Sequence, residues 1–132
     1  MDFSSLVLME RDAQTDLFIR ELGSYEVNES AEYITKFYCE DNVVFVFFDT
    51  KDDVEEWEYT AIFDFFSDEP FVKAGYDIES IDDEYNPTWK VTFKYEENYE
   101  KMQEKINEIT TLAQNEINRV KDEICSKKNE YI

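Results

Sequence analysis

Apolar residues near the C-terminal end recur with a helical period, and this stripe constrains the fold more than any other feature. Its seven members are spread over 22 positions in six steps, or 3.67 residues per step. No Gly or Pro interrupts residues 96–132, and acidic residues precede basic ones, as the helix dipole favours. The sequence therefore predicts one long C-terminal helix over 96–130. The stripe consists of Met102, Ile106, Ile109, Ala113, Ile117, Val120 and Ile124.

This helix is longer than a neighbouring sheet can cover. A helix over 97–128 measures about 48 Å at 1.5 Å per residue, whereas a strand of seven residues spans about 23 Å. The helix therefore either breaks near Thr110 and Thr111 or packs its far end on something else, of which a second copy of the chain is the simplest. Ile117, Val120 and Ile124 form the candidate dimer face. In the alternative, the whole stripe covers the chain's own sheet.

The first 95 residues have the composition of β-strands separated by polar turns. With two Gly and two Pro in 132 residues, nothing resembles a linker, so we predict a single domain over 1–132. The predicted fold is α+β: an antiparallel, mostly meandering sheet of about six or seven strands, followed by the C-terminal helix packed on it. The expected strands are 3–9, 17–27 with a bulge or bend at Gly23, 33–38, 43–48, 57–66, 71–81 as one irregular strand around Gly75, and 89–95.

The segment 54–66 fits two structures. Apolar and polar residues alternate from Trp57 onward, as in a strand, and Tyr, Thr, Ile and Phe dominate. A helix is the alternative, because apolar residues also recur there at spacings of three and four and Asp52 and Glu55 could form a capping box. We favour the strand.

The net charge of −20 arises from 33 acidic and 13 basic residues. Residues 40–84 contain 16 acids against only Lys51 and Lys73. This charge disfavours direct binding of nucleic acid or an anionic membrane, and it favours a basic protein as partner. We expect the acidic interaction surface at Asp52, Asp53, Glu55, Glu56 and Glu58, with a second patch at Asp82, Asp83 and Glu84.

Several catalytic chemistries lack the residues they need. The chain has no His, its Gly are only Gly23 and Gly75, and neither Cys39 nor Cys125 lies in a motif. Triads with His, His metal ligands and glycine-rich phosphate loops are therefore excluded. We predict no catalytic residue, no cofactor and no metal site.

The sequence thus favours a non-enzymatic acidic protein that binds a basic macromolecule, as an inhibitor, an immunity-like protein or a nucleic-acid mimic. Two alternatives stay open. One is a structural or regulatory homodimer through the long helix. The other is a small-ligand binder, or a carboxylate or metal enzyme, with a cavity between sheet and helix.

The N-terminal residues indicate a cytoplasmic protein. Asp2 is acidic and the apolar run from Leu6 to Met9 has only four residues, so we expect neither a signal peptide nor a membrane span. The segments MDFSSLVLMERD and ELGSYEV (21–27) resemble a family of small uncharacterised proteins from low-GC Gram-positive bacteria. This resemblance implies no activity and no site.

Overall fold

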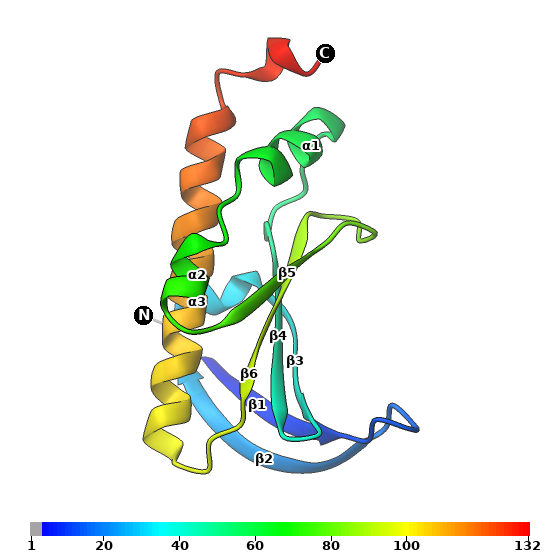
Figure 1. Ribbon diagram of the computed structural model, residues 1–132, viewed down its shortest axis with the longest axis vertical. Helices are drawn as coiled ribbons and strands as arrows, with labels where there is room; N and C mark the ends of the chain where they lie inside the picture. The colour runs from blue at the N-terminus through cyan, green and yellow to red at the C-terminus, as the bar shows by residue number, and fades with distance from the viewer. Residues whose placement is uncertain (1–3) are drawn as a thin grey trace.

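The computed structural model describes residues 4–132, and its longest element is the predicted C-terminal helix, α3 (Tyr99–Ile124; Figure 1). The Asn98 side chain caps this helix by accepting a hydrogen bond from the Lys101 backbone N–H at 3.0 Å. The helix is unbroken at Thr110 and Thr111, and at 26 residues it measures about 39 Å. All seven residues of the predicted stripe are at most 2% exposed. The helical period is therefore confirmed.

Six strands form one sheet in the order β2-β1-β3-β4-β6-β5. The predicted α+β fold is thus confirmed. The first residue of the expected strand 3–9, Phe3, lies outside the described residues. Besides the strands and α3, residues 4–132 form two short 3-10 helices, η1 (Glu29–Tyr33) and η2 (Lys128–Glu130), and two short α-helices, α1 (Glu56–Phe65) and α2 (Glu69–Lys73). The strands are β1 (Ser4–Arg11), β2 (Phe18–Val27), β3 (Ile34–Glu40), β4 (Val43–Asp49), β5 (Asp77–Ile81) and β6 (Thr88–Lys94).

Two neighbouring pairs, β1 with β3 and β4 with β6, depart from a meander, and the first of them is parallel. β1 and β3 are parallel, with Met9 opposite Tyr38, while the other neighbours in the sheet are antiparallel. The chain crosses from β2 to the far side of β1 through η1, which packs against α3. The sheet is therefore mixed, and it has β2 and β5 at its edges.

The predicted strand over 57–66 is wrong, because this segment is helix α1 (Glu56–Phe65). A capping box starts the helix, but Glu55 and Glu58 form it rather than Asp52 and Glu55: the Glu55 backbone N–H donates to the Glu58 carboxylate at 2.9 Å, and the Glu55 carboxylate accepts from the Glu58 backbone. β4 is already hydrogen-bonded to β3 on one side and β6 on the other. A strand that follows β4 therefore finds no free edge beside it.

The predicted irregular strand over 71–81 is also two elements. Residues Glu69–Lys73 form α2, with Pro70 in its first turn, and only Asp77–Ile81 form β5. Gly75 lies between them with φ of +95°, a conformation that suits glycine. The irregularity expected around Gly75 is therefore the boundary between a helix and a strand.

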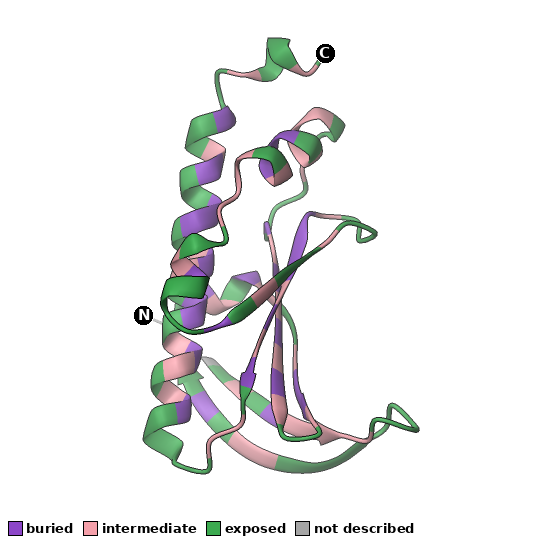
Figure 2. Cartoon of the chain, in the orientation of Figure 1, coloured by how far each residue is buried: buried purple, intermediate pink, exposed green. Residues whose placement is uncertain are grey.

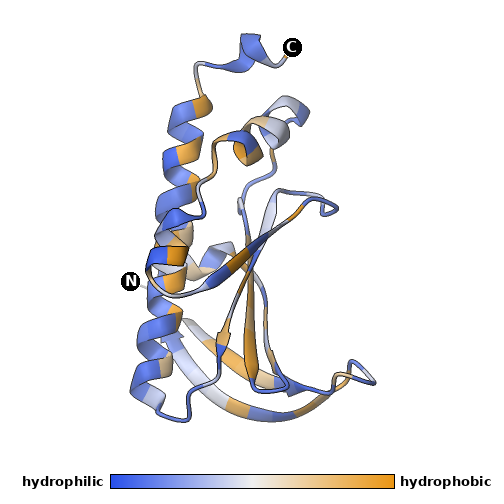
Figure 3. Ribbon diagram, viewed as in Figure 1, coloured by the Kyte–Doolittle hydropathy of each residue, from blue (hydrophilic) through white to orange (hydrophobic). Residues whose placement is uncertain are grey.

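The core lies between α3 and the face of the sheet turned toward it (Figures 2 and 3). Aromatic rings from β4, β6, α2 and the end of α1 pack together. The Phe66 ring stacks on Trp89 at 4.1 Å between centroids, and the Phe48 ring stacks on Phe71 at 5.6 Å. α3 packs against β2 and η1 and also against α1. Because α1 is a helix that lies on α3, the part of α3 beyond the sheet is covered by the chain itself.

A buried carboxylate joins α1 to α3. Glu116 lies within the apolar stripe and is 4% exposed. Its carboxylate accepts hydrogen bonds from the Ser67 backbone N–H at 2.8 Å and from Arg119 Nε at 3.0 Å. Arg119 in turn donates to the Phe65 carbonyl at 2.7 Å. The C-terminal end of α1 and the linker after it are thus fixed on α3 by one charged pair.

No helix within residues 4–132 has both the length and the apolar character needed to cross a membrane.

Replacing Glu116 by Ala should lower the free energy of unfolding by about 2–3 kcal/mol, since hydrogen bonds to a charged group contribute about 1.5–3 kcal/mol and the Ser67 N–H loses its partner. Urea denaturation measures the change. Glu104→Ala is the matched control, because Glu104 is exposed on the same helix and should change stability by less than about 0.5 kcal/mol. Equal effects of the two substitutions would contradict the role given to Glu116.

Alkaline pH should destabilise the fold through two buried tyrosines. Burial raises the pKa of Tyr25 from 10.0 to about 12, and burial with the hydrogen bond to Glu108 raises the pKa of Tyr76 further. Both pKa values are higher in the folded chain, so this contribution to stability is full below about pH 10 and is lost as the pH rises toward 12. Urea denaturation between pH 9 and 11 should show the decline, and Tyr25→Phe should make it shallower. An unchanged pH profile in Tyr25→Phe would refute the assignment.

Candidate functional site

The fold brings the two predicted acidic segments together. Tyr59 of α1 donates its hydroxyl to the Glu84 carbonyl at 2.8 Å and lies 3.2 Å from the Asp82 carbonyl. The Asn86 side-chain N–H donates to the Asp53 carboxylate at 3.1 Å. Both contacts join the segment 52–59 to the β5–β6 connection. We therefore treat the predicted residues as one acidic surface: Asp52, Asp53, Glu55, Glu56, Glu58, Asp82, Asp83 and Glu84.

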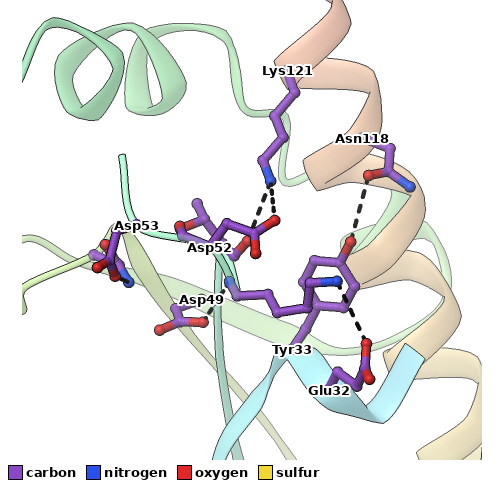
Figure 4. Close-up of polar contacts among 10 residues, drawn as sticks. Glu32, Tyr33, Asp49, Asp52, Asp53, Asn118 and Lys121 are labelled. Carbon is purple, nitrogen blue, oxygen red and sulfur yellow. Dashed lines mark hydrogen bonds and ion pairs between the residues drawn. The ribbon is translucent and has the colours of Figure 1, made fainter. Parts of the chain in front are cut away.

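The turn that leads into the acidic surface is held on two sides (Figure 4). The Asp49 carboxylate accepts from the Lys51 backbone N–H at 2.8 Å, and Lys51 has a positive φ of 66°. Lys121 of α3 contacts the Asp52 carboxylate at 3.5 Å and the Thr50 carbonyl at 3.4 Å. The Lys51 side chain turns toward Glu32 of η1 at 3.5 Å. Lys121 thus links this turn to α3.

Most carboxylates of the acidic surface have no cationic partner. Seven ion pairs form within residues 4–132, and only the contact between Lys121 and Asp52 includes a residue of this surface. The negative potential also acts on the phenol in its midst: burial, followed by the charges of Asp82, Asp83 and Glu84, raises the pKa of Tyr59. The surface is therefore a concentrated and largely uncompensated negative region.

The aromatic residues of this surface differ in exposure. Trp57 is half-buried, and its indole N–H donates to the Glu55 carboxylate at 2.9 Å. Tyr59 is half-buried as well. Tyr85, which the sequence reasoning did not single out, is 81% exposed. Its place in a polar turn beside Glu84 was the available signal, because aromatic residues in turns lack a sheet or helix face to cover them.

The candidate dimer face is not on the surface. Ile117, Val120 and Ile124 are at most 1% exposed within the single chain. The prediction of a dimer through these residues needs this correction, since another copy could reach them only if α1 left α3. The reason is the helical structure of α1, which supplies the cover that a second copy was expected to supply.

The remaining chemistry-bearing residues do not converge. Within residues 4–132, no three His, Cys, Asp or Glu side chains are grouped so that they could hold a metal ion. Cys39 is buried, and burial raises the pKa of its thiol. Cys125 is exposed near the end of α3, with its sulfur 3.0 Å from the Asp122 carbonyl.

Comparison with known proteins identifies the family of the chain. All of residues 1–132 match the model of a family of unknown function (DUF6762). The chain belongs to this family. No curated protein and no solved structure matches the chain. Membership of this family therefore assigns no activity to the chain.

Replacing Ile117 by Ala should destabilise the chain without changing its mass in solution. Truncating a fully buried Ile side chain to Ala lowers the free energy of unfolding by about 2–5 kcal/mol. Ile117 is 1% exposed, so its side chain offers no surface to a partner. Urea denaturation and sedimentation equilibrium measure the two quantities. A loss of self-association at unchanged stability would instead restore the helix as a dimer face.

Proposed function

We propose that this chain is a non-enzymatic binding protein whose acidic surface takes a basic protein as its partner. The observation that carries the proposal is the junction made by Tyr59 and Asn86, which holds two acidic segments side by side. Eight carboxylates lie on this surface, and one of them is ion-paired. Such a region attracts a cationic surface over several ångströms and speeds association.

The distribution of ion pairs supports binding over solubility alone. The other six ion pairs of the described residues lie outside the acidic surface, where Arg and Lys neutralise acids such as Glu40, Glu10 and Glu79. A charge needed only for solubility gains nothing from being concentrated at one place. An exposed aromatic residue, Tyr85, lies in the same region, and exposed Tyr side chains often contribute strongly to protein interfaces.

The test is affinity capture of a basic protein by the tagged chain from nuclease-treated lysate, with elution along a salt gradient. We expect one basic protein to elute only at high salt. Glu55 and Glu58 are left unchanged because they form the capping box that begins α1. The surface variant combines Glu56→Gln, Asp82→Asn, Asp83→Asn and Glu84→Gln, and it should weaken binding about tenfold or more.

The control variant removes the same four charges elsewhere. It combines Asp77→Asn, Glu97→Gln, Glu104→Gln and Glu123→Gln, whose side chains are exposed. The two variants have the same net charge, so a general attraction to basic proteins would weaken equally in both. Equal weakening, or capture of no basic protein by the unaltered chain, would refute the proposal.

A further inference from the structure

A hollow of about 610 Å³ opens next to the acidic surface, between the linker that joins α1 to α2 and the strands β5 and β6. Its volume is within the range of about 300–1,000 Å³ that is usual for ligand sites. Asp82 belongs both to this hollow and to the acidic surface. The lining residues are Phe63, Phe66, Ser67, Asp68, Ser80, Asp82 and Trp89.

Two phenylalanine rings, backed by Trp89, form the apolar part of the hollow. The Phe66 ring stacks on Trp89 at 4.1 Å between centroids with an interplanar angle of 19°, and the Phe63 ring is tilted by 55° to Trp89 at 5.3 Å. Trp89 is 1% exposed and anchors both Phe rings to β6. These rings are therefore a fixed wall, and aromatic walls bind alkyl chains and cations alike.

The polar part of the hollow consists of the hydroxyls of Ser67 and Ser80 and the exposed carboxylates of Asp68 and Asp82. Within residues 4–132, neither of these carboxylates takes part in an ion pair. Asp68 precedes α2 but makes no capping hydrogen bond with its side chain. Burial and the nearby charge of Glu116 raise the pKa of Asp68. No Lys or Arg lines the hollow, so a cation there would come from outside the chain.

We propose that this hollow receives an arginine side chain of the basic protein partner. The aliphatic stem would lie along the rings of Phe63 and Phe66, which Trp89 supports from below, and the guanidinium would meet the carboxylates of Asp68 and Asp82. Arginine suits the site better than lysine, because its planar group donates to two carboxylates at once and stacks on aromatic rings. This inference rests on the proposed function, and it names the group by which the partner is anchored.

The probe for the test is a fluorescently labelled hexa-arginine peptide, with hexa-lysine for comparison, and anisotropy measures its affinity for the full chain. Hexa-arginine should bind several-fold more tightly than hexa-lysine. Asp68→Asn should weaken the binding of hexa-arginine about fivefold or more, because one charge-assisted contact is lost. Asp77→Asn removes the same charge on exposed β5 outside the hollow, and it should change the affinity less than twofold.

A ring variant separates the anchor from net charge. Phe63→Leu keeps the charge and most of the apolar surface but removes the ring, so it should abolish the preference for hexa-arginine over hexa-lysine. Thermal melting confirms that each variant is folded. If Asp68→Asn or Phe63→Leu does not fold, Ser80→Leu replaces it. The larger side chain at Ser80 occupies space in the hollow, so this variant should weaken the binding of hexa-arginine about as much as Asp68→Asn is expected to.

The outcomes distinguish the two proposals. If Asp68→Asn and Asp77→Asn weaken the peptide equally, or if the two peptides bind alike, the anchor in the hollow is refuted while the acidic surface stands. If Asp68→Asn weakens the peptide but neutralising Glu56, Asp83 and Glu84 has no effect on capture of a basic protein, the hollow stands and the proposed function fails.

Discussion

The position of α1 beside the acidic surface depends on the buried carboxylate of Glu116. It joins α3 to the linker after α1 through the Ser67 N–H and holds Arg119, which in turn binds the Phe65 carbonyl. A buried charge is costly unless it is paired and hydrogen-bonded, and here both conditions are met. Because α1 is fixed in this way, Tyr59 reaches the β5–β6 connection, and Phe63 and Phe66 reach Trp89.

The helix α3 and most of the sheet could be predicted because their signals are local. The stripe from Met102 to Ile124 has one period over more than 20 residues, and no other regular structure buries such a set on one face. The strands β3, β4 and β6 are similarly rich in aromatic and β-branched residues between polar turns. For α3 and β6 the spacing of the apolar residues also specifies which side faces the core, whereas the continuous apolar run of β4 does not.

Helix α1 could not be predicted in the same way, because its alternation is compatible with both structures. What decides is the neighbourhood: β4 has β3 and β6 on its two edges, and the capping box at Glu55 starts a helix. This error also produced the expectation about the dimer. With α1 predicted as a strand, no element of the chain was expected to pack on the C-terminal end of α3. Ile117, Val120 and Ile124 were therefore predicted to contact a second copy of the chain. One local ambiguity therefore changed the predicted surface of the molecule.

The sequence located the acidic residues but not their assembly, which depends on contacts across more than 20 positions. Tyr59 and Asn86 are neutral donors, and they draw two like-charged segments together by binding a carbonyl and a carboxylate. Like charges held close together repel one another and oppose the compact state. In the proposed complex, a cationic partner would relieve that repulsion on binding, so the same charges would add to the affinity for a basic surface. The proposal therefore rests on the junction of these segments rather than on the total charge.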